Sequence, residues 1–364
     1  MHMSINAINP VNRSFSQKIL FITNNLSQAE LALLSALKSR FEFLIYINNA
    51  HKEYSFQTDY ILPSNVKMTS DYKSVIMLTS IFSAVITTVG HISPVLNEKF
   101  TSILKACIAC ELPIIEVPHG LYQWGFNFSD DSQFVNTASN THGGGYPIPT
   151  FANFQISWFD GDSVGYPRYR EERIRKISGV EVPTYTVITT NTNWYMYGFD
   201  DQRVLAQAIF EYARSRPEEL FIWCHHSAEL TQMNLLNNML GAKPPNIFRY
   251  GHDKDIYFHS MDTTEDVIEH AAAGITTIST CLLDFELHSI PTAVFWSEGL
   301  STVSASMTHA ATFKTPAELM SLEFTVPITG RLKQFDSESF DNKIASVIDG
   351  EVPINLSQRI FLHT

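Results

Sequence analysis

The sequence predicts an α/β protein made of two doubly wound, Rossmann-like domains. Short apolar runs alternate with longer amphipathic runs along the chain, which is typical of parallel βα units. This rhythm stops at residues 121–150 and restarts after residues 179–183. The length of 364 residues also fits two domains of roughly 150 residues or more. We therefore expect domains at 1–180 and 181–364, with the last helix free to pack back on the first domain.

The first half alternates strands and helices up to a long irregular stretch. Residues 121–150 are rich in Gly, Asn, Ser and aromatic side chains, and a loop of that length is usually functional or mobile. The apolar runs predict strands at 18–25, 41–48, 83–90, 112–120 and 151–159. The amphipathic runs predict helices at 26–40, 64–80 and 94–110, and one more after the turn at 165–169.

The second half repeats the alternation. Its apolar runs predict strands at 184–192, 219–226, 247–250, 256–260, 275–280 and 291–297. Its amphipathic runs predict helices at 201–215, 227–240, 263–274, 282–290, 315–321 and 337–349. Two such domains in tandem would direct the carboxyl ends of both sheets toward one interdomain cleft, which is where α/β sheets bind ligands.

The composition excludes several classes of protein. Hydrophobic residues make up 45% of the chain and charged residues 17%, which is a globular balance. The net charge of −12 argues against a general nucleic-acid binder, because such a protein needs a basic face. No stretch has the length of a membrane span, and the first residues lack the apolar core of a secretion signal. We expect a cytoplasmic protein, with peripheral contact to the inner face of the membrane left open.

The sequence predicts no metal site and no cofactor. Cys107 and Cys110 form one CxxC inside a predicted helix, but no second pair completes a zinc site, so we expect plain buried thiols. Asp160 and Asp162 sit in an Asp-Gly-Asp triplet that favours a turn over a metal site.

Two candidate site residues fall at turns of the first half. His119 directly follows an apolar strand, where a neutral imidazole could take a proton from an attacking hydroxyl, or could merely cap the turn. Arg168 lies in Gly-Tyr-Pro-Arg, and its planar fork suits a phosphate or carboxylate. Taken alone, this segment favours a surface turn with a solvated Arg168.

The second half contains a candidate phosphate-binding site that has no glycine-rich loop. Ser279 and Thr280 open a helix directly behind a strand, so backbone N–H groups and the positive end of the helix dipole point to the same edge. Asp284 follows in that helix and could orient the site. His225 ends another strand and could donate to a phosphate of a nucleotide. The plain alternatives are an ordinary N-cap and a half-exposed turn histidine.

Three further residues are weaker candidates for acceptor or lid contacts. Asn193 follows the first strand of the second half, and His142 precedes three glycines that could close as a lid. Trp124 lies in the same long irregular stretch as His142.

Taken in order, these segments resemble the catalytic region of CDP-glycerol glycerophosphotransferases, the teichoic-acid and capsule polymerases. The resemblance spans roughly residues 80–300 and rests on His119-Gly120, Gly-Tyr-Pro-Arg at 165–168, His225, and the stretch 275–291. It implies the GT-B fold, two Rossmann-like domains facing a cleft. It also implies that an activated polyol phosphate or sugar passes from a nucleotide donor to a growing surface polymer.

The resemblance also implies roles for single residues. His119 matches the family's general base, and His225 matches a histidine that contacts donor phosphates. The family's Ser-Ser pair corresponds to Ser279 and Thr280, and the Asp that follows it corresponds to Asp284. The Arg of the family's Gly-Tyr-Pro-Arg corresponds to Arg168. The chain departs from the family at Thr277, where an Asp is usual, and at His226-Ser227, where a Pro is expected. These departures leave the donor open between CMP, CDP and UDP types.

We therefore expect a metal-independent glycosyl or polyol-phosphate transferase that uses a nucleotide-activated donor and a saccharide or polyol-phosphate acceptor. It would serve the synthesis of a bacterial capsule, teichoic acid or lipopolysaccharide. A nucleotide-sugar epimerase or hydrolase, or a sialyl- or Kdo-transferase of the same plan, is the alternative. A non-enzymatic two-domain binding protein is the third hypothesis.

Overall fold

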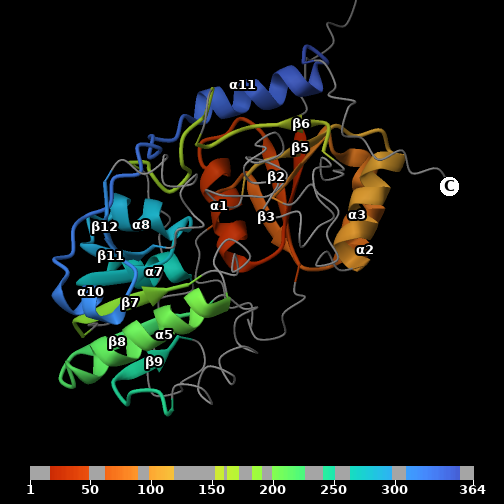
Figure 1. The fold of residues 1–364 in the computed structure, drawn as a ribbon. Helices are drawn as coiled ribbons and strands as arrows, with labels where there is room; N and C mark the ends of the chain where they lie inside the picture. The colour runs from red at the N-terminus through yellow and green to blue at the C-terminus, as the bar shows by residue number, and fades with distance from the viewer. Residues whose placement is uncertain are drawn as a thin grey trace, which may run out of the picture.

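Two separate parallel sheets form the framework of the molecule (Figure 1). The computed structural model describes residues 17–48, 62–88, 98–118, 152–159, 162–171, 183–190, 199–225, 241–250, 263–296 and 309–352. Each sheet has six strands within these ranges, and all strand pairs are parallel. The expected α/β class with two doubly wound units is therefore confirmed.

The first sheet has the strand order β3-β2-β1-β4-β5-β6. The chain adds β2 and β3 on one side of β1 and then β4, β5 and β6 on the other side. The strand order therefore reverses between β1 and β4, and α/β sheets bind ligands at such a switch point. The strands are β1 (Lys18–Thr23), β2 (Glu42–Ile47), β3 (Val66–Thr69), β4 (Ala84–Thr87), β5 (Ile114–Glu116) and β6 (Phe154–Gln155). The helices are α1 (Leu26–Ala36), α2 (Tyr72–Met77), α3 (Glu98–Ala109) and the short 3₁₀ helix η1 (Thr79–Ile81).

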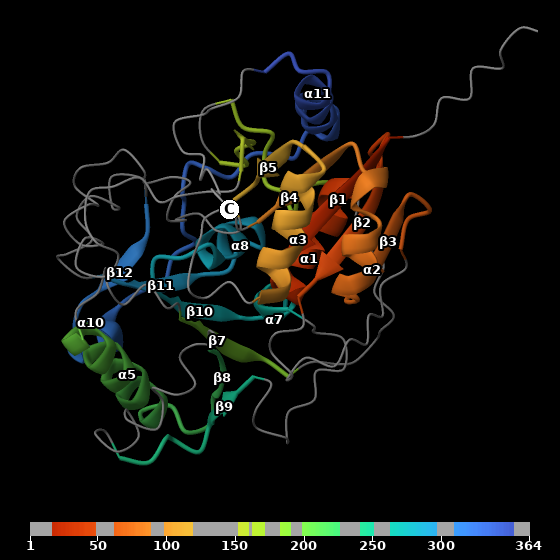
Figure 2. The ribbon, with the colours of Figure 1, turned by 90° about the vertical axis from the view of Figure 1, so that its right-hand side faces the viewer.

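The alternation of side chains along β1 gives this sheet two buried faces. Ile19 and Phe21 pack in the cluster that contains α1, whereas Leu20 and Ile22 pack in the cluster that contains α2 and α3. The final helix α11 (Ser337–Ile348) joins the first of these clusters through Phe340, Ile344 and Val347. Helix α11 therefore contributes to the core of the N-terminal half, and Figures 1 and 2 show it beside the first sheet.

Polar contacts fix α11 in this position. The carboxylate of Asp341 accepts from the Ser39 hydroxyl at 2.6 Å and from the backbone N–H of Arg40 at 2.8 Å. We use front half for residues 17–171 together with α11, and rear half for residues 183–328.

The second sheet has the order β12-β11-β10-β7-β8-β9, with its switch point between β7 and β10. Thr189 and Thr276, at the carboxyl ends of those two strands, are hydrogen-bonded at 2.6 Å. The strands are β7 (Tyr185–Thr189), β8 (Leu220–Cys224), β9 (Ile247–Arg249), β10 (Ala273–Thr276), β11 (Thr292–Phe295) and β12 (Ala311–Phe313). The helices are α5 (Phe199–Arg214), α7 (Thr264–Glu269), α8 (Cys281–Leu287) and α10 (Pro316–Ser321).

Three local expectations were wrong. The helix expected at 263–274 ends at Glu269, because Ala273–Thr276 pair as β10, so the strand expected at 275–280 starts and ends earlier. The segment 64–80 is not one helix, because residues Val66–Thr69 pair in parallel with Phe43–Tyr46 as the edge strand β3, and only Tyr72–Met77 is α-helical. Strand pairing across the sheet outweighs the weak helical periodicity there. Cys110 is exposed rather than buried, although Cys107 in the same helix is buried.

The described helices give no candidate for a bilayer-crossing segment: none of them is both long enough and apolar enough.

Close packing between β10 and α8 depends on a glycine. A Cβ atom on Gly274 would lie 2.4 Å from the ring of Phe285 and 2.9 Å from the Thr292 hydroxyl. No flexible side-chain end can yield at this point, because Phe285 is fully buried.

We expect Gly274→Ala to lower the free energy of unfolding by about 1–3 kcal/mol, because overpacking forces a buried ring to move. Urea denaturation followed by circular dichroism measures this loss. The double variant G274A/F285L should recover part of it, since the smaller side chain vacates the contested space. Unchanged stability of Gly274→Ala would contradict the packing argument.

Candidate functional site at the junction of the halves

A glycine turn directs two polar side chains into the junction between the halves. Gly165 has φ +84°, and a Cβ atom there would lie 2.1 Å from the carbonyl oxygen of Gln334. The close approach is fixed by hydrogen bonds from Tyr166 N to Lys333 O at 2.9 Å and from Asp336 N to Val164 O at 2.8 Å. Only glycine combines this backbone angle with this contact. The turn is thereby bound to the segment that leads into α11.

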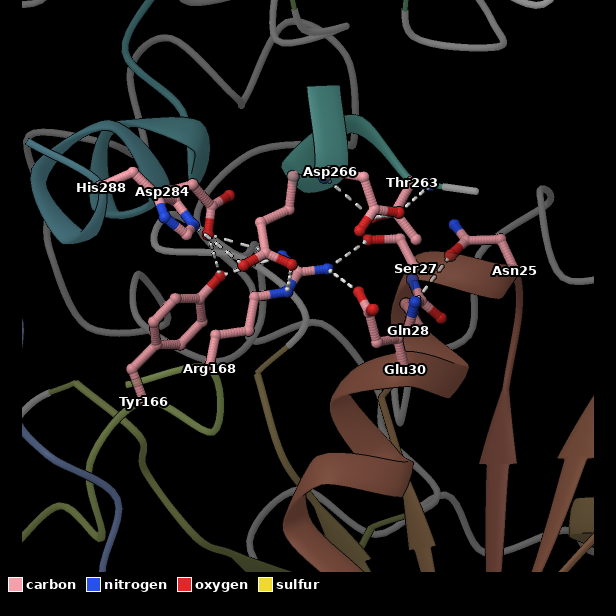
Figure 3. A network of polar contacts seen from close by, with 11 residues as sticks. Asn25, Ser27, Gln28, Glu30, Tyr166, Arg168, Thr263, Asp266, Asp284 and His288 are labelled. Carbon is pink, nitrogen blue, oxygen red and sulfur yellow. Dashed lines mark hydrogen bonds and ion pairs between the residues drawn. The ribbon is translucent and has the colours of Figure 1, made fainter. Parts of the chain in front are cut away.

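The guanidinium of Arg168 is the centre of a buried ionic cluster (Figure 3). It forms ion pairs with Glu30 at 2.8 Å, Glu265 at 3.0 Å and Asp284 at 3.5 Å. Glu30 belongs to α1 of the front half, whereas Glu265 and Asp284 belong to α7 and α8 of the rear half. The Arg168 side chain is only 5% exposed. One cation from the front half therefore pairs with carboxylates from both halves.

Hydroxyl groups complete the coordination of the cluster. The Tyr166 hydroxyl donates to Asp284 Oδ1 at 2.7 Å and accepts from Arg168 Nη1 at 3.1 Å. Arg168 Nη2 also donates to the Ser27 hydroxyl at 3.2 Å. The burial of Tyr166 raises its pKa well above the usual value, so it stays a neutral donor. Charged groups buried with this many partners avoid most of the cost of an unpaired buried charge.

The electrostatics of the cluster favour proton uptake. Burial raises the pKa of Asp284 to about 6, and the nearby Glu265 charge adds to the rise against the opposing effect of Arg168. His288 lies 3.1 Å from Glu265. Burial alone would lower the His288 pKa, but the hydrogen bond and charge of Glu265, with the charges of Asp284 and Glu269, raise it.

Local sequence explains why carboxylates meet here. Asn25 caps α1, accepting from Gln28 N at 2.9 Å, and this sets Glu30 within the early turns of the helix. Thr263 and Asp266 form a capping box on α7, and Glu265 lies in its first turn. Asp284 lies in the first turn of α8. Helix N-termini favour negative side chains, which accounts for Glu265 and Asp284, whereas Glu30 lies in the second turn of α1.

The carboxylates of Glu30, Glu265 and Asp266 are close enough to suggest a metal site. One oxygen of each lies within 4.8 Å of the others. However, Arg168 already pairs with two of them, and Asp266 accepts from the backbone and hydroxyl of Thr263 at 2.8 and 3.0 Å. The group is therefore an ion-pair cluster around a guanidinium.

The structure brings Arg168 and Asp284 together, as two of the residues singled out from sequence. Arg168 is not the solvated surface residue that its turn favours, because it is buried between the halves. In this structure both residues bind protein groups, and their roles toward a donor phosphate stay predictions.

The rear-half candidates lie at the carboxyl edge of the second sheet. His225 directly follows β8 and stacks on Trp223, with ring centroids 4.5 Å apart. Ser279 accepts from Cys281 N at 3.2 Å, and Thr280 is the N-cap of α8. Since β7 lies between β8 and β10, the two groups are separated by two strand spacings, about 10 Å.

The carboxyl edge of the front sheet is also polar. Thr88 donates to Gln28 Oε1 at 2.7 Å, linking the end of β4 to α1, and Asn48 Nδ2 donates to Asn24 Oδ1 at 3.1 Å. Glu116 ends β5 with 1% exposure, three residues before His119. His119 itself, with Trp124, His142 and Asn193, lies outside the described residues. The expected general base and the acceptor or lid contacts therefore stay predictions.

Four residues of the cluster were not identified as site residues from sequence: Glu30, Tyr166, Glu265 and His288. A signal existed for Glu30, which is the one charged residue in the mostly apolar helix LSQAELALLSA. A charge on an apolar helix face suggests a buried ion pair. Nothing local identifies its partner, which lies 138 residues away in the chain.

Comparison with known proteins shows similarity in structure alone. No protein-family model and no curated protein sequence matches the chain. Staphylococcus aureus MnaA, in a co-structure with UDP, has a TM-score of 0.53 at 10% identity, over 94% of this chain and 100% of that chain. This likeness and the two parallel six-stranded sheets show the GT-B architecture.

Two further solved structures match nearly as much of the chain. The Methanocaldococcus jannaschii UDP-GlcNAc 2-epimerase, in complex with UDP-GlcNAc and UDP, has a TM-score of 0.48 at 13% identity, covering 92% of this chain and 100% of that chain. The wall teichoic acid polymerase TagF has a TM-score of 0.46 at 10% identity, covering 92% and 89%.

We expect Tyr166→Phe to cost about 1–3 kcal/mol of unfolding free energy, because it removes the hydroxyl that donates to a buried carboxylate. Guanidinium denaturation at neutral pH measures the loss. Tyr169→Phe is the matched control, since that side chain lies in the same turn but is 39% exposed. Equal effects of the two substitutions would argue against a special role for the Tyr166 hydroxyl.

Proposed function

We propose that the protein is a GT-B enzyme acting on a nucleotide-activated donor, and that it transfers a glycosyl or polyol-phosphate group. The observation that carries this proposal is the carboxyl edge of the rear sheet. There Ser279 and Thr280 open α8 directly behind β10, and His225 ends β8. The UDP in the MnaA co-structure supports a nucleotide as ligand of this fold.

The proposed donor site uses groups that stabilise negative charge. The diphosphate would meet the hydroxyls of Ser279 and Thr280 and the imidazole of His225. Hydrogen-bond donors that point at a leaving phosphate stabilise its negative charge. Because they are already in position, no free energy is spent on reorienting them during the reaction.

The proposed transfer is a single displacement. The acceptor hydroxyl attacks the donor carbon or phosphorus while the bond to the nucleotide phosphate breaks. The hydroxyl proton passes to His119, and the nucleotide leaves with the negative charge. The resemblance to capsule and teichoic-acid polymerases supports a surface polysaccharide as acceptor, and it also supports a place for the reaction at the inner face of the membrane.

A nucleotide-sugar epimerase or hydrolase would use the same donor site without a saccharide acceptor. Product analysis separates the two, since only a transferase needs the second substrate. A sialyl- or Kdo-transferase would be distinguished by its CMP-linked donor.

We expect one class of nucleotide among CMP, CDP, UDP and GDP to raise the melting temperature, because a ligand that binds only the folded state stabilises it by mass action. Differential scanning fluorimetry with each nucleotide measures the shift. Ser279→Ala/Thr280→Ala should remove most of it. If no nucleotide shifts the transition at concentrations of several millimolar, the donor proposal is wrong.

We expect His119→Ala to lower turnover by about 10²–10⁴-fold, since the acceptor proton then lacks its base. Release of the free nucleotide from the preferred donor, in the presence of an acceptor, measures the rate. His309→Ala, at an exposed position of the rear half, is the control and should retain wild-type turnover. Near-normal turnover of the His119 variant would rule out this assignment.

A further inference from the structure

Among the residues that the structure describes, contacts of two kinds join the two halves. Leu283 of α8 is fully buried in the apolar cluster of the front half, and its contact is insensitive to pH. The ionic cluster around Arg168 joins α1 to α7 and α8, and its charge depends on protonation. The cluster is therefore the part of the junction through which solution conditions can act on the arrangement of the halves.

Titratable groups from every surrounding element face this cluster. The Asp284 and His288 side chains are 4% and 6% exposed, and Glu265 is 12% exposed, so their charges are poorly screened by water. The groups are Glu30 of α1, Tyr166 and Arg168 of the glycine turn, Glu265, Asp266 and Glu269 of α7, and Cys281, Asp284 and His288 of α8.

Two of these groups are neutral near neutral pH. Tyr166 and Cys281 are neutral, because burial raises the pKa of both, that of Cys281 to about 11. Asp266 is satisfied within its own capping box. The pKa of Asp284 is raised to about 6, and that of His288 is raised above its usual value, so both side chains can change protonation between about pH 5 and pH 8.

The charge balance of the inner cluster differs between the two protonation states. With His288 charged and Asp284 neutral, two positive charges face the carboxylates of Glu30, Glu265 and Asp266. With His288 neutral and Asp284 charged, Arg168 alone faces four carboxylates. The second state leaves the larger excess of negative charge in a buried place, and only the helix N-termini offset it in part.

We propose that Arg168 is a positioning residue in a proton-sensitive latch, which holds α1 of the front half against α7 and α8 of the rear half and loosens as the pH rises. Contact with water at the junction relieves the excess negative charge, so deprotonation favours a more open arrangement. Because α8 follows Ser279 and its N-cap Thr280 directly, the latch and the proposed donor site are joined by one helix.

The sign of the effect follows from the two groups together. Both have folded-state pKa values above their unfolded values, so the folded junction binds more protons than the open one. Their stabilisation is fully present below the unfolded pKa and is lost as the pH rises through the folded pKa. For Asp284 this loss runs from about pH 4 up to about pH 6, and for His288 it begins near 6.5 and ends at the higher folded pKa.

The test is hydrogen exchange of the backbone amides of α1, α7 and α8 at about pH 5.5 and about pH 8, corrected for intrinsic exchange rates. In the wild-type protein, protection in these helices should fall by roughly tenfold at the higher pH, while α5, packed on α10, keeps its protection. No substrate is needed, so this result is independent of the nucleotide-binding test.

Three variants separate a latch from ordinary destabilisation. Asp284→Asn is permanently uncharged and should reduce the pH-dependent drop to about threefold or less, while His288→Gln and Arg168→Gln should show low protection at both pH values. Arg168→Lys should restore part of it. Arg170→Gln is the matched control, since Arg170 contacts Leu34 and Ser337 of the front half, and it should retain the wild-type pH dependence.

Two results would overturn the proposal. One is wild-type protection of α1, α7 and α8 that does not change with pH, which needs no variant to be folded. The other is an undiminished drop in Asp284→Asn.

Discussion

The arrangement of this molecule depends on one buried guanidinium. Arg168 is almost fully withdrawn from water and is surrounded by carboxylates from three helices. Taking charges out of water is costly, and the cost is recovered only when the partners are held in good geometry. Removing one partner would leave an unpaired charge buried away from water. The positions of α1, α7 and α8 relative to one another are therefore tightly constrained, and the glycine turn that presents Arg168 is constrained with them.

The path of the chain supplies that geometry. The turn at Gly165 is hydrogen-bonded to residues 333–336, which connect the rear half to α11, and α11 is buried against the front sheet. The turn is thus held by the segment through which the chain returns from the rear half. Glu286 adds to this connection by accepting from the backbone and hydroxyl of Thr329 at 2.9 and 2.5 Å. The rear half is connected to the front half by the chain segments that pass between them, by the packing of Leu283 and by the ionic cluster.

Helix α8 connects this architecture to the proposed chemistry. Its first residues follow Ser279 and Thr280, its fourth residue is Asp284, and His288 caps its end. A helix of this length moves as a unit, so a ligand that shifts its beginning would also shift the residues that pair with Arg168 and Glu265. This physical link connects the proposed donor site to α1 and to the polar edge of the front sheet.

The sequence by itself determined the secondary structure class, the division into two halves and the strand ends where polar residues gather. Those features depend on local periodicity and on the rule that parallel strands end at the same edge. It also pointed to Arg168 and Asp284, but assigned them to a donor phosphate. Only the tertiary structure showed that Arg168 and Asp284 belong to one ion-pair cluster with Glu30. Glu30 and Arg168 are 138 residues apart, and no local pattern records such a pairing. Likewise Val66–Thr69 became a strand through pairing with β2, and α11 joined the front core through contacts across some 300 residues of sequence. Burial and long-range pairing decided these points, because the free energy of a buried charge or an edge strand depends on partners that the neighbouring sequence does not contain.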